Sequence, residues 1–135
     1  MTTVGASIVG ARSISLSFLA ASRESDQKIA AVVKHHGHLL RTRVMAKASG
    51  RPGPNVITGD YRRSITVVFS HAAGMHTATV GTNNPQARRL EFGFHGQDSL
   101  GRHYNQPPRP HFGPALDEIE PGYLAGLESA LESLG

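Results

Sequence analysis

The longest helical pattern in this chain, between Ser22 and Ala48, constrains the fold more than any other feature. Apolar residues recur there in steps of three and four, which is the spacing of an amphipathic helix. Either Ser22 or Ser25 can cap its start, because a serine hydroxyl accepts a hydrogen bond from a backbone N–H of the first turn. Gly37 lies in the middle, where glycine costs about 1 kcal/mol relative to alanine. We therefore expect close approach by another backbone, or a slight bend, at Gly37.

A second helical pattern occupies the C-terminal part of the chain. Its apolar residues are again three and four apart, and they stay in phase across Pro121 and Gly122. This spacing predicts one kinked helix from about Pro114 to Leu134. The first helix has to end before residues 49–54, because two prolines and two glycines in that segment forbid its continuation.

Between the two helices, short runs predict an antiparallel hairpin. Thr58 can cap a helical turn through Ser64, and residues 65–70 then alternate between apolar and polar as a half-buried strand does. Residues 72–75, Ala-Ala-Gly-Met, predict the turn, and residues 76–81 predict the second strand. Two amphipathic helices packed on a small antiparallel sheet make an α+β domain.

The start of the chain carries less pattern. Serine alternates with isoleucine, leucine and phenylalanine over residues 13–18, which fits a short strand, although Ile14 and Phe18 would also share one face of a helix. We divide the chain after this segment, into an N-terminal arm over residues 1–21 and a single domain over residues 22–135.

A long loop is expected between a short helix and the C-terminal helix. Asn84 and Pro85 are typical of a helix start, with asparagine as the cap and proline in the first helical position, and Gly93 ends this helix. The residues from Phe94 to Pro110 show no periodicity. A loop of that length in a compact domain is usually functional or becomes ordered against a partner.

Composition excludes several classes of protein. A chain of 135 residues can bury one core but leaves no room for a separate catalytic domain. It contains no cysteine, which excludes a disulfide scaffold, a thiolate metal site and a cysteine nucleophile. No apolar stretch approaches the roughly 20 residues that cross a bilayer. Residues 1–4 lack the basic start of a signal peptide, so we expect cytosolic synthesis and no membrane partner.

The charge distribution leaves two interpretations open. A net charge of +4 favours contact with nucleic acid. The basic residues occur singly or in pairs, however, and the C-terminal third is acidic. This separation suits head-to-tail contacts between subunits about as well as it suits DNA. The charged residues that we expect at such contacts are Arg62, Arg63, Arg88, Arg89, Glu128 and Glu132. A small basic DNA-binding or regulatory protein is therefore the alternative function.

No motif indicates catalysis. Among the eight histidines, His35 and His38 could share a helix face, but His36 points into the apolar stripe and no carboxylate follows at helical spacing. The acidic residues are too scattered to bind magnesium. No Gly-x-Ser-x-Gly elbow is present. We predict no enzymatic activity, no metal and no cofactor.

Several short motifs follow one another in a set order along this chain. They are Thr58-Gly59-x-x-Arg62-x-Ser64-Ile65 before a strand, a second strand ending Val80-Gly81, then Glu91-Phe92-Gly93, and Pro110-x-Phe112-x-Pro114-Ala115-Leu116 before the last helix. Each motif alone occurs often by chance, but their order and separation are much more specific. Taken in order, they resemble the tail-completion or neck proteins of long-tailed double-stranded DNA bacteriophages. The resemblance covers about Ser22 to Leu134, and residues 1–21 have no clear counterpart.

The resemblance implies a structural protein of the virion. Such a protein is made in the cytoplasm of the bacterial host and forms a homo-oligomeric, six-fold ring at the head–tail junction. Its partners would be the head-completion or stopper protein on one side and the tail terminator protein on the other. Double-stranded DNA would pass through the ring without sequence-specific binding, so we expect few basic side chains in the lumen.

A closed ring requires a heterologous interface, in which one face of a subunit meets a different face of the next. Exposed ion pairs contribute at most about 1 kcal/mol each, so they would select the register while apolar residues of the 94–110 segment supply affinity. Those apolar residues could equally fold back over their own domain. The predicted interface residues are Arg62, Arg63, Arg88, Arg89, Glu91, Phe94, Leu100, Tyr104, Phe112, Glu128 and Glu132.

Overall fold

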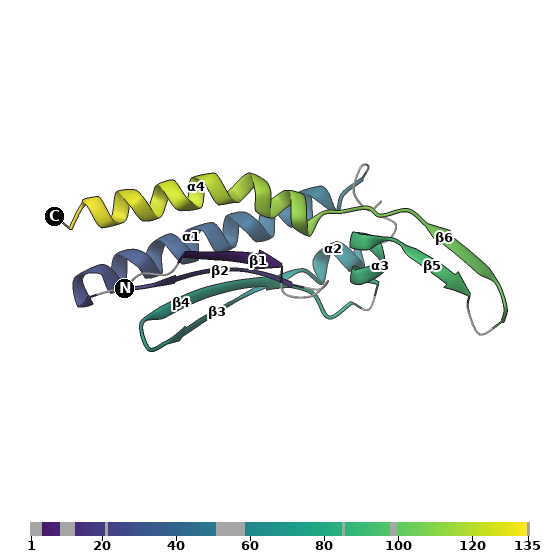
Figure 1. The fold of residues 1–135 in the computed structure, drawn as a ribbon, viewed down its shortest axis with the longest axis horizontal. Coiled ribbons are helices and arrows are strands. Elements are labelled where there is room, and N and C mark those ends of the chain that lie inside the picture. Colours follow the sequence, from purple (N-terminus) through teal and green to yellow (C-terminus); the bar gives the residue numbers. More distant parts are fainter. Residues whose placement is uncertain are drawn as a thin grey trace.

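Two long helices lie side by side on one face of a four-stranded antiparallel sheet, and a separate two-stranded hairpin projects from one end (Figure 1). The helices are α1 (Arg23–Lys47) and α4 (Phe112–Glu132). The predicted α+β class, with a long N-terminal and a C-terminal helix, is confirmed. The computed structural model describes residues 4–8, 13–20, 22–50, 59–84, 86–97 and 100–134, apart from the side chains of residues 4–8 and 104.

The four-stranded sheet has the order β1-β2-β4-β3. Its predicted hairpin is confirmed, because a turn at Ala73 and Gly74, both with positive φ, joins the last two strands along the chain. Strand β2 pairs on one side with β1 and on the other with β4, so part of the expected N-terminal arm is an inner strand of the domain. The strands are β1 (Val4–Ile8), β2 (Ser13–Leu19), β3 (Thr66–Ala72) and β4 (Met75–Gly81).

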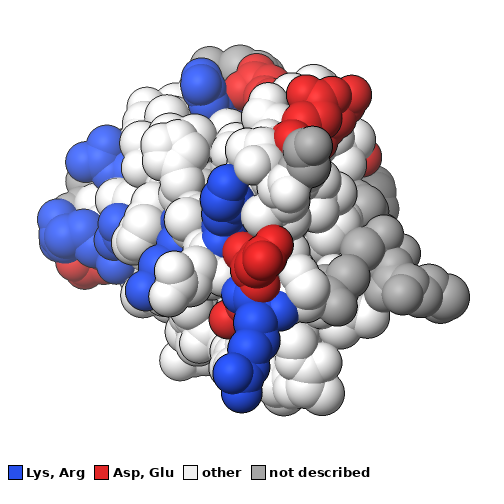
Figure 2. All heavy atoms as spheres, turned by 90° about the vertical axis from the view of Figure 1, so that its left-hand side faces the viewer, with Lys and Arg blue, Asp and Glu red and all other residues white. Residues whose placement is uncertain are grey.

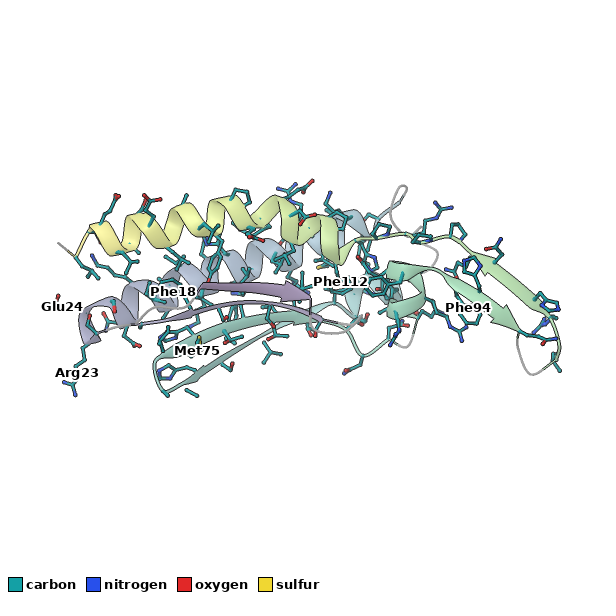
Figure 3. The ribbon with its side chains drawn as sticks, viewed as in Figure 1. Phe18, Arg23, Glu24, Met75, Phe94 and Phe112 are labelled. Atoms are coloured by element: carbon teal, nitrogen blue, oxygen red, sulfur yellow. The ribbon has the colours of Figure 1, made fainter. Side chains whose placement is uncertain are left out.

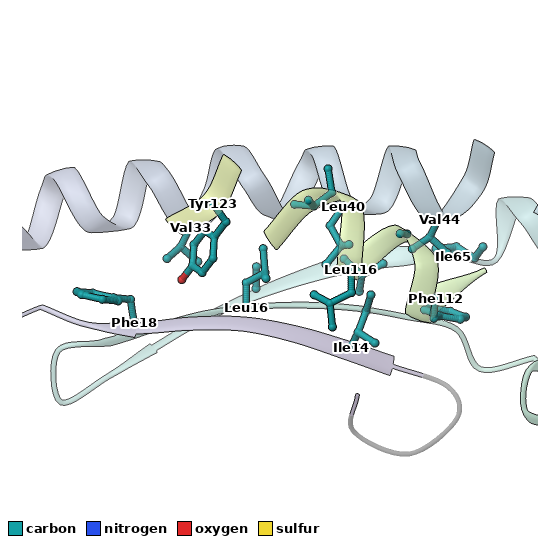
Figure 4. Packing of buried hydrophobic residues seen from close by; sticks show 14 of the residues in the cluster. Ile14, Leu16, Phe18, Val33, Leu40, Val44, Ile65, Phe112, Leu116 and Tyr123 are labelled. Atoms are coloured by element: carbon teal, nitrogen blue, oxygen red, sulfur yellow. The ribbon is translucent and has the colours of Figure 1, made fainter. Parts of the chain in front are cut away.

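Burial alternates along β2, which decides between strand and helix for this segment. Ile14, Leu16 and Phe18 are buried, and the serines between them are partly exposed. Figure 4 shows these three side chains facing those of α1 and α4. The strand interpretation of residues 13–18 is therefore correct. Tyr123 of α4 completes this core, and its hydroxyl donates a hydrogen bond to the Ser17 carbonyl at 2.9 Å.

Both serines proposed as the cap of α1 take part in capping it. Ser22 is the N-cap, and its hydroxyl accepts from the Ser25 N–H at 3.2 Å. The Ser25 hydroxyl accepts in turn from the Ser22 N–H at 3.0 Å, which completes a capping box. The helix then runs without interruption to Lys47.

Gly37 marks a close approach, as predicted, but to side chains of the sheet and not to another backbone. A Cβ at this position would lie 2.7 Å from the Ala78 Cβ and 2.8 Å from Cε1 of Phe69. Real Cβ atoms do not come so close to their neighbours. Glycine therefore allows α1 to lie directly on β3 and β4.

Helix α4 continues through Pro121, as the periodicity predicts, and it begins two residues earlier than expected, at Phe112. The bend at Pro121 stays a prediction. Two short helices, α2 (Asp60–Arg63) and α3 (Ala87–Phe92), lie near its start. Helix α3 begins after the expected position, although the Asn84 side chain does accept from the Gln86 N–H at 2.9 Å. Thr58 and Pro85, the other predicted helix-start residues, lie outside the described residues.

The long loop expected over residues 94–110 is wrong. Strands β5 (Phe94–Gln97) and β6 (His103–Gln106) form an antiparallel hairpin that projects beyond the four-stranded sheet (Figure 1). Periodicity did not reveal it because none of the described residues of this hairpin belongs to the hydrophobic core. Its side chains therefore need not alternate between apolar and polar.

Candidate functional site

The three most distinctive sequence motifs meet at the N-terminus of α4, where the projecting hairpin joins the domain. Tyr61 comes from α2, Glu91 from α3, and His111 directly precedes α4. Figure 3 shows the two aromatic residues that bound this region, Phe94 at the start of the hairpin and Phe112 at the start of α4. We call Tyr61, Glu91 and His111, together with the N-terminus of α4 that they contact, the motif junction.

Glu91 caps α4 from a distant part of the chain. One carboxylate oxygen, Oε1, accepts from the N–H groups of His111 and Phe112, each at 2.9 Å, and Oε2 accepts from the Gly113 N–H at 3.1 Å. The first N–H groups of a helix have no partner within the helix. A carboxylate there is also favoured by the helix dipole. Glu91 is only 5% exposed, so these bonds are shielded from water.

His111 and Tyr61 extend the same network. The Tyr61 hydroxyl lies 2.5 Å from Nε2 of His111, and Nδ1 of His111 lies 3.0 Å from the Arg109 carbonyl oxygen. A carbonyl can only accept, so Nδ1 carries the proton and Nε2 accepts from the Tyr61 hydroxyl. Burial lowers the pKa of His111, against the opposing effects of the Arg109 carbonyl and Glu91. Burial, together with the charge of Glu91, raises the pKa of Tyr61. Both side chains are therefore neutral at pH 7.

A tyrosine, a histidine and a glutamate in hydrogen-bond contact have the composition of a proton-transfer site, but this one is closed. His111 is completely buried. No buried side-chain nitrogen or oxygen among the described residues lacks a hydrogen-bond partner. Among the described residues, therefore, the His111 imidazole is shielded from solvent and each buried polar side-chain atom already has a partner. The hydrogen bonds of the motif junction hold α2, α3 and the start of α4 together.

We expect acid to destabilise the fold through His111. The unfolded chain would bind a proton at this residue near its ordinary pKa of 6.5, whereas the folded chain binds it only at lower pH. Between these two pKa values the unfolded state holds more protons, so the free energy of unfolding falls as the pH falls. Urea denaturation between pH 7 and pH 5 measures this dependence. It should be weaker in His111→Gln, and an equal dependence in both proteins would contradict the assignment.

The base of the hairpin is held tightly against α3. The Arg109 N–H donates to the Leu90 carbonyl at 2.6 Å, which returns the chain after β6 to the helix it left. Gly93 has a φ of 81°, and a Cβ there would lie 2.8 Å from the Gln106 carbonyl oxygen. The Arg89 guanidinium lies 3.9 Å from the centre of the Phe94 ring. The hairpin therefore leaves the domain in a defined direction.

Beyond its base, the hairpin forms a sheet of its own. Strands β5 and β6 pair only with each other among the described strands, so each has an outer edge open for pairing. At the tip, Leu100 is 75% exposed. An isolated two-stranded hairpin is marginally stable in water, and none of the described residues of β5 and β6 belongs to the hydrophobic core.

Two residues of the predicted interface set are buried inside the chain. Glu91 and Phe112 are 5% and 1% exposed, so their side chains offer little surface to a neighbouring molecule. Both are buried because they fix the start of α4. Their motifs gave no sign of this contact, since it joins positions some 20 residues apart.

The other predicted residues are spread over the two ends of the domain. Arg62 donates to the Ser49 hydroxyl at 2.9 Å, and Arg63 lies 2.5 Å from the Asp60 carboxylate. Arg89 and Phe94 are brought together at the hairpin base. Arg88 is exposed beside them, whereas Glu128 and Glu132 are exposed near the far end of α4. The side chain of Tyr104 lies outside the described part of the chain.

Sequence reasoning missed one cluster of polar side chains altogether. Asp26 of α1 lies beside His71 and His76, which face each other across the β3–β4 hairpin. A signal for the histidine pair was present, because a two-residue turn at positions 73 and 74 makes residues 71 and 76 cross-strand partners. Among the helix histidines, His36 is occupied by a contact of 2.9 Å between its Nδ1 and the Val32 carbonyl.

Comparisons with protein-family models, curated proteins and solved structures found no match. In the described part of the chain, no helix combines the length and the apolar character required to cross a membrane. The geometry of the motif junction and of the hairpin that it anchors is therefore the main guide to function.

Proposed function

We propose that this chain is a structural protein of a bacteriophage virion, which forms a ring at the head–tail junction and provides a conduit for DNA. The family resemblance suggests the role. The observation that carries it is the motif junction, where the motifs of that resemblance converge to anchor a projecting hairpin. A buried, fully bonded anchor that holds an exposed arm suits assembly and offers nothing to a substrate.

The projecting hairpin supports contact with a second copy of the chain. A free strand edge can add a strand from a neighbour, and main-chain hydrogen bonds then provide affinity that does not depend on large side chains. In a ring, each arm would lie on the next subunit, which is a heterologous contact. The short strands β5 and β6 would become stable when covered in this way.

The sheet face turned away from the helices supports a conduit for DNA. Figure 1 shows both long helices on the opposite face. None of the described side chains on the open face is charged, so this face offers no cation to a passing phosphate and would not hold the duplex. The outward residues of β2, β3 and β4 are Ser13, Ser15, Ser17, Leu19, Thr66, Val68, Ser70, Ala72, Met75, Thr77, Thr79 and Gly81.

In a head-to-tail arrangement the arginine pairs of one subunit would approach the acidic end of α4 in the next, although that end also carries basic side chains. The arginine pairs lie near the hairpin, and Glu128 and Glu132 lie toward the other end of α4, a helix about 30 Å long. Figure 2 views that other end and shows basic side chains next to acidic ones, with no continuous area of one sign. Charge would therefore set the register of subunits, and the hairpin would supply most of the affinity.

The decisive experiment compares the full chain with a variant in which residues 95–105 are replaced by Gly-Ser-Gly. This variant keeps Phe94 and the motif junction, so its circular dichroism and melting temperature should stay close to those of the unchanged protein. We expect rings of the full chain in electron micrographs and loss of these rings in the variant. A DNA-binding assay on both proteins tests the alternative function.

Three results would contradict the proposal. One is a full chain that is monomeric at all concentrations and shifts DNA with a steep loss of affinity as salt rises, because that is the behaviour of a DNA-binding protein. Another is rings that persist in the variant in which residues 95–105 are replaced. The third is a phage that lacks this protein and still joins heads to tails.

A further inference from the structure

Asp26, His71 and His76 form a cluster at the end of the domain away from the projecting hairpin. Nε2 of His76 lies 2.8 Å from Oδ1 of Asp26, and Nε2 of His71 lies 4.0 Å from the same oxygen. The two imidazole rings are stacked, with centroids 4.6 Å apart and an interplanar angle of 21°. One nitrogen or oxygen from each residue lies within 4.8 Å of the other two.

The backbone holds these three residues in place. The tight turn at Ala73 and Gly74 makes His71 and His76 direct cross-strand partners, and partners in register point to the same face of a sheet. That face is covered by α1, whose first turns bring Asp26 onto the pair. The arrangement is therefore a product of elements that the core already fixes.

We propose that Asp26, His71 and His76 bind a divalent transition-metal ion, with Zn²⁺ as the best match. Two imidazole nitrogens and a carboxylate oxygen are zinc ligands, and three protein ligands leave a fourth position for water. Magnesium and calcium ions prefer oxygen ligands, so a site with two imidazole nitrogens disfavours the binding of either ion. This proposal concerns a different surface from the hairpin and does not depend on the role in the virion.

The distances to Asp26 are close to those of a zinc site, but the exposed imidazole of His71 has to turn, because the two stacked rings are nearly parallel and their nitrogens do not point at one common ion. In a tetrahedral zinc site with bonds of about 2.0 to 2.2 Å, ligand atoms lie about 3.3 to 3.6 Å apart, which is between the two separations of 2.8 and 4.0 Å to Asp26. The side chains of Asp26 and His71 are 41% and 59% exposed, so both can rotate, while His76 is only 11% exposed and stays fixed. The proton between His76 and Asp26 would leave as the metal binds.

An ion can reach the cluster from solvent. One groove of about 310 Å³ is lined by His71 and His76 together with Lys34, Phe69 and other residues. A second, of about 470 Å³, is lined by Asp26 together with Ser22, Gln27 and their neighbours. Each of the three ligand side chains therefore lines a groove that is open to solvent, and each groove is also lined by one basic residue, Lys34 or Arg23.

The test is calorimetric titration of the full chain with Zn²⁺. We expect one ion per chain. His71→Ala should weaken binding by about 100-fold or more, because the loss of outer-shell partners alone costs about 10 to 100-fold. Asp26→Asn, which keeps the shape of the side chain, should weaken it as well. Circular dichroism of each variant checks that the fold is kept, and the exposure of both side chains makes this the expected result.

His35→Ala is the matched control, because it removes an exposed histidine of α1 that could bind zinc with His38 at helical spacing. We expect it to leave the affinity and the stoichiometry unchanged. Substituting Co²⁺ should give the intense visible absorption of a four-coordinate ion in the unchanged protein and not in His71→Ala. The proposal is overturned if no zinc binds, or if binding survives His71→Ala and Asp26→Asn, or if His35→Ala abolishes it.

Discussion

Glu91→Ala is expected to lower the free energy of unfolding by about 3 to 5 kcal/mol, because each buried polar group left without a partner costs about 1 to 3 kcal/mol. The alanine would leave the N–H groups of His111, Phe112 and Gly113 without their acceptor, and all three lie at the shielded start of α4. The favourable contact between a carboxylate and the helix dipole would be lost at the same time.

Two further variants separate the role of the carboxylate from that of a surface charge. Glu91→Gln keeps one carbonyl oxygen as an acceptor, so its loss of stability should lie between those of alanine and the unchanged protein. Glu128→Ala removes an exposed glutamate of α4 and should change stability by no more than about 0.5 kcal/mol. Urea denaturation measures all three variants. A loss below about 1 kcal/mol for Glu91→Ala would mean that water or another group replaces the cap.

The parts of the fold that sequence could predict are those with one face on the core. Helix α1 and strands β3 and β4 each place a stripe of apolar side chains on the same interior, and this leaves a period of 3.6 or 2 in the sequence. The hairpin of β5 and β6 has no such face, so its residues carried no period and were expected to form a loop. The hairpin has no face on the core, which explains why its sequence shows no period. For the same reason we expect a partner molecule to cover it.

Pairings between distant segments could not be predicted from the sequence. Nothing local to residues 13–19 indicates that this strand lies between β1 and β4, so it was assigned to an N-terminal arm. The cap that Glu91 provides is a second case, because its partners begin at His111. Two glycines of the motifs do lie at corners of the backbone, since Gly59 and Gly93 have φ values of 82° and 81°. How the corners join depends on the tertiary structure.

Gly37→Ala is expected to destabilise the protein by about 1 to 2 kcal/mol, although alanine is the better helix former. In an open helical position this change gains about 1 kcal/mol. Here the new methyl group would lie 2.7 Å from the Ala78 Cβ, which is attached directly to the backbone of β4 and cannot rotate away. Overpacking of this kind costs about 1 to 3 kcal/mol. The clash should therefore outweigh the gain in helix propensity.

Gly122 of α4 provides the matched control, since it is also a helical glycine but is exposed. Its nearest neighbour beyond its own helix is Nε2 of His36, 4.0 Å from the position of a Cβ. Gly122→Ala should therefore stabilise the protein by about 0.5 to 1 kcal/mol. Urea denaturation of the two variants tests whether identical substitutions have opposite signs because of contact with the sheet.

A double-mutant cycle identifies the contact responsible. Ala78→Gly removes the methyl group against which the new side chain would press, so the cost of Gly37→Ala should be smaller in that background by at least about 0.5 kcal/mol. If the cost is the same with and without the Ala78 methyl group, the clash lies with the Phe69 ring alone. If Gly37→Ala is stabilising, α1 does not lie as close to β4 as the structure places it.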